Sequence, residues 1–219
     1  MLQEEAATPV LNATYFGDIQ PQTASADDHR HVLFKSGRMY KHQLLRINYT
    51  TYDVRRSEDI INPDTRRRDI MLLSNDDEDD SHPFRYARVL GVYHVNVVYT
   101  GPGMLDYLAR RLDFLWVRWF HYSDSKPVEW ADYRLDNVHF PPIASDDAFS
   151  FIDPKEVLRA CHIIASFASG KVHCDAISIS KLANDSQDWR SYASIGMLHH
   201  FMASLNLKNL IADLPTVIC

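Results

Sequence analysis

Cysteine and histidine stand side by side at two places in the C-terminal half of the chain. Cys161 precedes His162, and His173 precedes Cys174. Thiolate and imidazole are the ligands that zinc prefers, so this pattern is the first to weigh as a metal site. Adjacent residues of a strand point to opposite faces, so each pair offers one ligand to a shared site, whereas a structural zinc needs four. We therefore predict no metal site and no cofactor.

Acidic residues are the second group that could do chemistry. A nuclease or transposase centre needs carboxylates that converge on two metal ions, and Asp53, Asp69 and Asp113 are the acids within or at the edges of predicted strands. The acidic run 76–80 lacks the alternating register of a calcium loop, and we interpret it as solvated. The chain has no Walker loop, G-x-S-x-G or H-E-x-x-H motif. We predict no catalytic residue.

Arginines are concentrated between residues 55 and 68. They are Arg55, Arg56, Arg66, Arg67 and Arg68. If they share one face they could contact phosphates, and a patch that engages three phosphates of duplex DNA would give a slope of about −2.7 for log affinity against log salt. Alternatively they are solvated and pair with the acids between them. The net charge of −6 argues against a general coating of nucleic acid, so we expect at most a weak contact.

Aromatic side chains crowd two later segments. The candidate binding residues among them are Tyr86, Trp116, Trp119 and Phe120, with Tyr122 close by. Rings that line a mouth between loops can form a cage for a methylated ammonium, because the cation is attracted to ring faces. In a sheet the same rings more often pack in the core.

The segments that carry these rings determine the predicted fold class. Residues 85–99 and 112–122 are rich in Val, Tyr, Trp and Phe and flank a Gly-Pro-Gly turn, which predicts neighbouring strands. Gly91 inside the first strand indicates a bulge or bend. We expect one face of this strand to carry Ala87, Val89, Tyr93, Val95 and Val97. Apolar residues on both faces of the second strand predict a central position.

Shorter patterns complete the predicted architecture. Strands are expected near residues 45–49, 69–74 and 137–140, Asp153 and Pro154 predict a short helical turn, and 157–167 is a strand for which helix is the alternative. A period of three to four from Asp188 to Leu205 predicts an amphipathic helix. The expected fold is mainly β, a strongly bent sheet or small barrel. It divides into a flexible arm (1–30), a barrel-like domain (31–170) and a linker with a helical tail (171–219).

The compartment is predicted from composition. Cys161, Cys174 and Cys219 are too few for a disulfide framework, which favours a reducing compartment. The N-terminus lacks the apolar core of a signal peptide, and no run approaches the roughly 18 apolar residues of a membrane span. We expect an intracellular protein without membrane contact.

Four stretches of the sequence resemble a known family. RINYTTYDVRRSEDIINPDTRRRDIMLLS, HPFRYARVLGVYHVNVVY, RLDFLWVRWF and FIDPKEVLRACHIIASFASG resemble the C-terminal region of Plavaka-type transposon-encoded proteins of mushroom-forming fungi, over about Leu33 to Trp189. In that family this region carries no assigned chemistry, so the resemblance implies an accessory piece and transfers no catalytic residue. The order of YARVLGV, FLWVRWF and VLRACHI is also similar to bromo-adjacent-homology (BAH) and SH3-like barrels of chromatin proteins.

These resemblances imply a function of the interaction class. We expect a non-enzymatic module of a transposon-derived fungal protein that binds a protein or chromatin, with a nuclear location. The alternative is a fragment of a DDE-type transposase that contacts nucleic acid through the basic segment Arg55 to Arg68.

Overall fold

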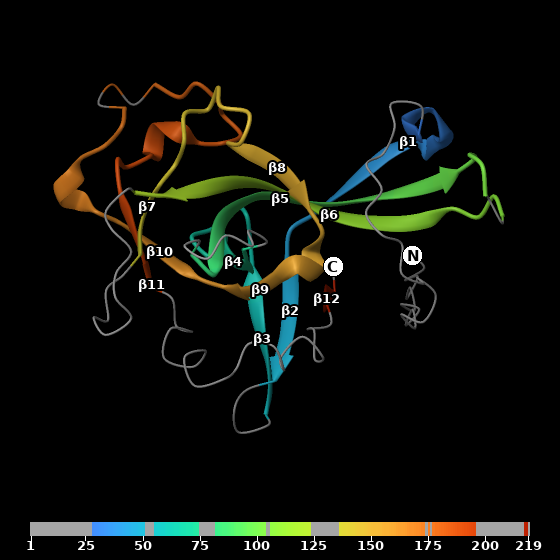
Figure 1. The fold of residues 1–219 in the computed structure, drawn as a ribbon, viewed down its shortest axis with the longest axis horizontal. Coiled ribbons are helices and arrows are strands. Elements are labelled where there is room, and N and C mark those ends of the chain that lie inside the picture. Colours follow the sequence, from blue (N-terminus) through green and yellow to red (C-terminus); the bar gives the residue numbers. More distant parts are fainter. Residues whose placement is uncertain are drawn as a thin grey trace, which may run out of the picture.

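Strands dominate the computed structural model, which describes residues 28–50, 55–74, 82–103, 106–123, 136–173, 175, 177–195 and 217–218 (Figure 1). They are β1 (Val32–His42), β2 (Leu45–Thr50), β3 (Arg56–Ile61), β4 (Asp69–Leu73), β5 (Phe84–Tyr99), β6 (Arg110–Tyr122), β7 (Asp136–His139), β8 (Phe149–Ile152), β9 (Val157–Ala160), β10 (His162–Ala165), β11 (Tyr192–Ile195) and β12 (Val217–Ile218). The described helices are single 3-10 turns at Asp28–His31, Pro154–Glu156, Phe167–Ser169 and Asp185–Gln187. Within these ranges, no helix could cross a membrane. The mainly β class predicted from the sequence is confirmed.

The larger sheet curls into a nearly closed barrel. Its strand order is β10-β11-β7-β6-β5-β4-β9, with β1 added to β5 and β8 added to β6. The two ends of this order, β9 and β10, follow each other in the chain and are separated by Cys161, whose amide donates to the Asp69 carbonyl at 2.9 Å. The continuous segment β9–β10 therefore forms both ends of the sheet, with β9 paired to β4 and β10 paired to β11. It closes the sheet and hides strand edges that would otherwise invite aggregation.

β5 and β6 form the longest pair, and β5 contains a bulge. Val89 lies opposite Val117, and Gly91 lies opposite Trp116. Two steps along β5 therefore correspond to a single step along β6. The extra residue reverses the alternation, so Val92 and not Tyr93 packs in the apolar cluster that holds Val89. The bulge predicted at Gly91 is confirmed. The shared face predicted for Ala87, Val89, Tyr93, Val95 and Val97 is wrong, because one inserted residue moves every later side chain to the other face.

Two apolar clusters lie on the two sides of the barrel wall. The interior is filled from β4, β5, β6, β7 and β11 by Met71, Phe84, Tyr86, Phe120, Val138 and Tyr192. On the outer side, the β2–β3 hairpin and β8 cover the wall, and the buried residues there include Leu45, Ile47, Ile61, Leu72, Val89, Val117, Trp119 and Ile152. β6 is thus covered on both faces, as its sequence predicts.

The basic segment contains a strand that the sequence did not predict. β3 pairs with β2 in a second small sheet and buries Ile61. Arg56 and Glu58 are exposed, and Asp59 is held by Arg159 Nε at 2.7 Å, so charged residues on both faces of β3 hide its period. A turn that begins at Asn62 and Pro63 ends the strand, and in it the Thr65 amide donates to the Asn62 carbonyl at 3.1 Å.

The C-terminal third differs in part from its prediction. The strand predicted for 157–167, rather than the alternative helix, is confirmed by β9 and β10. Asp153 caps the predicted short helix by accepting from the Lys155 amide at 2.9 Å. Residues 196–205 of the predicted helix lie outside the described residues, as do residues 1–27 of the predicted flexible N-terminal segment. Tyr192–Ile195 form β11, which pairs with β7 and β10, rather than helix. The barrel therefore extends past the boundary expected at residue 170.

Candidate functional site

The distal halves of β5 and β6 leave the barrel together with β1 as a three-stranded arm (Figure 1). We define the arm as β1 with residues 92–99 of β5 and 110–115 of β6. Directly opposed residues of neighbouring strands point to the same side. Met39, Val95 and Leu112 form one such row, and the adjacent row of Tyr40, His94 and Asp113 points to the other side.

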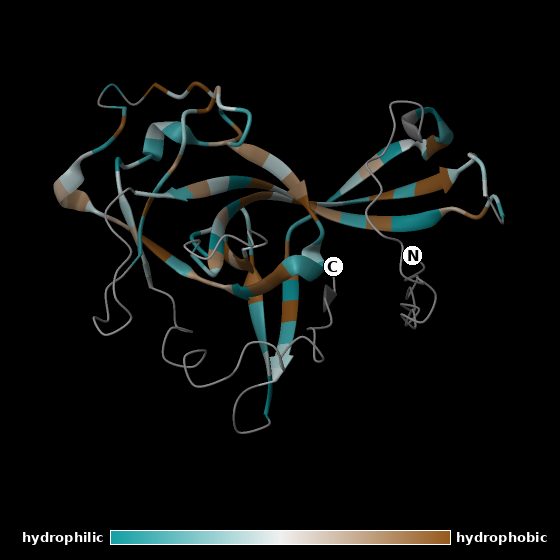
Figure 2. Ribbon diagram, viewed as in Figure 1, coloured by the Kyte–Doolittle hydropathy of each residue, from teal (hydrophilic) through white to brown (hydrophobic). Residues whose placement is uncertain are grey.

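The two faces of the arm differ in chemistry. The more apolar face carries Val32, Phe34, Met39, Tyr93, Val95, Val97, Tyr99, Leu112 and Phe114, and the basic residues Lys41 and Arg110 lie in the same rows. The opposite face, called the polar face here, carries Tyr40, His42, His94, Asn96, Arg111 and Asp113, with Leu33 and Val98 toward the tip and the buried Val92 and Leu115 next to the barrel. Figure 2 shows hydrophobic stretches on these strands as far as the tip of the arm. Both sides of the barrel wall are covered, whereas on the arm Phe34, Met39 and Leu112 are exposed around the buried Val95.

Three potential metal ligands meet on the polar face. His42 Nε2 lies 2.6 Å from His94 Nδ1, and one nitrogen of each ring and a carboxylate oxygen of Asp113 all lie within 4.8 Å of one another. The Tyr40 ring stacks on His94 with centroids 4.6 Å apart. Arg111 donates to Asp113 Oδ1 through Nε at 2.9 Å and Nη2 at 2.8 Å. Burial lowers the pKa of His94, and the charges of Arg111 and His42 lower it further, so the neutral ring is favoured.

The cysteine–histidine pairs considered first are not assembled in this way. Cys161 packs against the barrel interior, whereas its neighbour His162 is exposed. His173 Nε2 lies 3.6 Å from Asp185 Oδ2, and Cys174 lies outside the described residues. In the part of the chain that the structure describes, the group of His42, His94 and Asp113 is the one that gathers three potential ligands. No spacing motif marks these three residues, because strand register alone brings them together.

The acids of the transposase-type alternative do not converge. Asp69 is opposite Arg88 and Asp113 is opposite His94. Six residues of β5 separate these two positions, which is roughly 20 Å along a strand, whereas a two-metal centre holds its ions about 4 Å apart. Asp69 is buried and accepts from Arg88 Nε at 2.7 Å. Asp53 lies outside the described residues.

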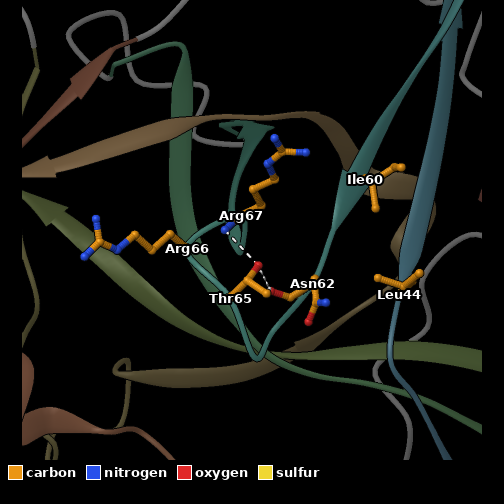
Figure 3. Close-up of a pocket in the computed structure, with 6 residues that line it drawn as sticks. All are labelled: Leu44, Ile60, Asn62, Thr65, Arg66 and Arg67. Atoms are coloured by element: carbon orange, nitrogen blue, oxygen red, sulfur yellow. Dashed lines mark hydrogen bonds between the residues drawn. The ribbon is translucent and has the colours of Figure 1, made fainter.

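The five arginines fall into separate places. Arg66 and Arg67 line an open pocket of about 410 Å³ with Leu44, Ile60, Asn62 and Thr65, and their side chains point in different directions (Figure 3). Arg55 and Arg56 lie at the other end of β3, where Arg56 is opposite Thr50. A six-residue strand spans roughly 17 Å between these two ends. Arg68 is half-buried, and its pKa is lowered by burial and then by the charge of Arg88.

The aromatic residues lie on different sides of the barrel wall. Tyr86 and Phe120 are directly opposed on β5 and β6 and fill the interior. Trp119 belongs to the outer cluster, where Arg85 lies 4.0 Å from its ring centroid. Trp116 is half-buried, with its ring centroid 6.0 Å from that of Phe149. The structure thus does not gather these four rings around one mouth.

A histidine and an aspartate also meet at one end of the barrel. His82 Nε2 lies 3.2 Å from Asp136 Oδ1, and the hydroxyls of Tyr86 and Tyr122 contact Asp136 and His82 at 2.8 and 2.7 Å. Burial raises the pKa of both phenols, and the charge of Asp136 raises that of Tyr86 further. Phenols held protonated in this way are poor nucleophiles, so we interpret the group as a structural network.

Comparisons of the chain with protein-family models, with curated proteins and with solved structures give no match.

Proposed function

We propose that the protein is a non-enzymatic interaction module that binds a protein partner through the apolar face of the arm. The exposure of that face carries the proposal. Phe34, Met39 and Leu112 are 59%, 59% and 53% exposed, on β1 and β6, the two outer strands of the arm. Contiguous exposed apolar surface on a sheet is costly in water and typical of docking surfaces.

The charge beside this face indicates the chemistry of the partner. Lys35, Arg38 and Lys41 are exposed along β1, although the chain as a whole has a net charge of −6. Basic residues next to an apolar surface favour an acidic segment with interspersed aromatic or aliphatic side chains, because opposite charges speed encounter and the apolar side chains provide affinity. The occupant we propose is such a segment of another protein.

The barrel supports a non-enzymatic role in two ways. Asp69 on β4 and Asp113 on β6 lie opposite well-separated positions of β5, and the His82–Asp136 pair contacts the phenols of Tyr86 and Tyr122. The resemblance to a region of Plavaka-type proteins that has no assigned chemistry is consistent with this role. On the same grounds we extend the proposal to an accessory, transposon-derived protein of the nucleus.

Fluorescence polarisation with labelled synthetic peptides tests the proposal. The probe alternates Asp or Glu with Phe or Leu, and two control peptides replace either the acids by Lys or the apolar residues by Ser. We expect binding of the acidic apolar probe, weakened at least about tenfold, or 1.4 kcal/mol, by F34S/M39S/L112S. The matched control Leu182→Ser removes an apolar side chain outside the arm that is more exposed, at 70%, and should leave binding unchanged.

Three results would overturn this function. The first is equal binding of the acidic peptide without apolar residues, which would make the contact purely electrostatic. The second is equal binding by the triple variant. The third is reversible self-association in sedimentation experiments that F34S/M39S/L112S abolishes, which would make a second copy of the chain the occupant.

A further inference from the structure

On the opposite, polar face of the arm, we propose a binding site for a divalent transition-metal ion of the zinc class, with His42, His94 and Asp113 as its ligands. The three residues lie on β1, β5 and β6, which are adjacent strands, and all are half-buried. Two imidazoles and one carboxylate are a ligand set that zinc uses where one coordination position stays open. Ligands on paired strands are held more precisely than ligands on loops.

The observed distances require small side-chain movements to hold an ion. Two nitrogens bound to a tetrahedral zinc at 2.0–2.1 Å are about 3.4 Å apart. His42 Nε2 and His94 Nδ1 are 2.6 Å apart, a hydrogen-bond distance, and the ligand atoms span at most 4.8 Å. An ion between the rings takes the place of the hydrogen that bridges them. Stacking on Tyr40 holds the His94 ring, so His42 and Asp113 make most of the adjustment.

Arg111 tunes the site through the same carboxylate. It donates to Asp113 Oδ1 from two nitrogens, at 2.9 and 2.8 Å, and to Oδ2 from Nε at 3.2 Å. A carboxylate offers about four lone-pair directions, so Asp113 can keep this hydrogen bonding while one oxygen binds the ion. The positive charge of Arg111 nevertheless opposes a cation a few ångströms away. Removing that charge while keeping a donor should therefore strengthen metal binding.

Titration calorimetry of the full chain with Zn²⁺, and absorption spectra with Co²⁺, test the site. We expect one ion per chain and tetrahedral cobalt bands. H42A, H94A and D113N should each weaken binding at least about tenfold, which is 1.4 kcal/mol. The matched control His162→Ala removes an exposed histidine of β10 and should leave binding unchanged.

Arg111→Gln tests the proposed metal binding even if a ligand variant fails to fold. Because all three ligands remain, we expect it to bind Zn²⁺ several-fold more tightly than the parent chain. Unchanged or weaker binding by this variant would overturn the site, as would the absence of stoichiometric binding to the parent chain. Equal loss of binding in His162→Ala would show adventitious binding to surface histidines and would also overturn it.

Discussion

Arg118 and Asp188 form an ion pair of 2.6 Å whose side chains are 3% and 5% exposed. Arg118 is directly opposite Arg88, which in turn pairs with Asp69 at 2.7 Å. Two neighbouring arginines inside the barrel thus each have a carboxylate of their own. The guanidinium of Arg118 also lies 3.9 Å from the ring centroid of Phe140. The pair fastens the segment before β11 to the central strand β6.

Breaking this pair should be strongly destabilising. We expect Asp188→Asn to lower the free energy of unfolding by about 3–5 kcal/mol, because it leaves the charge of Arg118 buried without compensation. Urea denaturation measures the effect. The matched control is Glu58→Gln in the exposed pair with Arg46, for which the loss should stay below about 1 kcal/mol. A similarly small loss for Asp188→Asn would contradict the structural role of the pair.

At the bulge in β5, the ring of Tyr93 occupies the space that a side chain at position 91 would need. A β-carbon on Gly91 would lie 2.3 Å from the ring of Tyr93, which itself stacks near Phe114. We expect Gly91→Ala to destabilise the protein by about 1–3 kcal/mol, because the ring must leave its place. In a Tyr93→Ala background the cost of the alanine should largely disappear. A double-mutant cycle in denaturant measures this coupling, and additive effects would argue against the contact.

Asp185 should make stability depend on pH in acid. Its carboxylate accepts from the amides of Ile179 and Ser180 at 2.8 and 2.9 Å. Burial acts to raise the pKa of Asp185, but hydrogen bonds from Ser178 and these amides outweigh it and lower the pKa to about 2. The folded-state pKa lies below the unfolded value of about 3.9, so the stabilisation is fully present above about pH 5 and is lost as the pH falls toward 2.

Asp185→Asn should therefore be less stable than the parent chain at neutral pH, and the difference should shrink as the pH approaches 2. Thermal melts across this range measure it. Asp175→Asn, a change at an exposed position nearby, is the control. A difference that does not vary with pH would show that the carboxylate charge is not what stabilises this loop.

Contact with nucleic acid should reflect the separation of the arginines. Arg66 and Arg67 share one turn, so they can engage about two phosphates, and the slope of log affinity against log salt on duplex DNA should be about −1.8 rather than −2.7. R66A/R67A should flatten the response, and R55A/R56A should leave it nearly unchanged. A steeper slope that depends on both pairs would mean that the two ends of β3 act as one patch.

Local sequence was sufficient to predict the elements that show a regular hydrophobic pattern or are marked by glycine, proline or a capping residue. The aromatic and β-branched runs of β5 and β6, the bulge at Gly91 and the cap at Asp153 depend on residues near one another in the chain. β3 was missed because its charged face masks the alternation, and the faces of distal β5 were misassigned because the bulge reverses them. The direction of a side chain after a bulge depends on one residue of register, which composition does not encode.

The tertiary structure alone decided which residues meet. His42 and His94 are 52 positions apart in the sequence, and Arg118 and Asp188 are 70 positions apart. Their contacts depend on strand register and on how β9 and β10 close the barrel. The sequence determined that the segments of His94 and Arg118 are strands, because backbone and side-chain preferences are local. Pairing between distant strands is set by burial over the whole chain, and the two faces of the arm follow from that pairing.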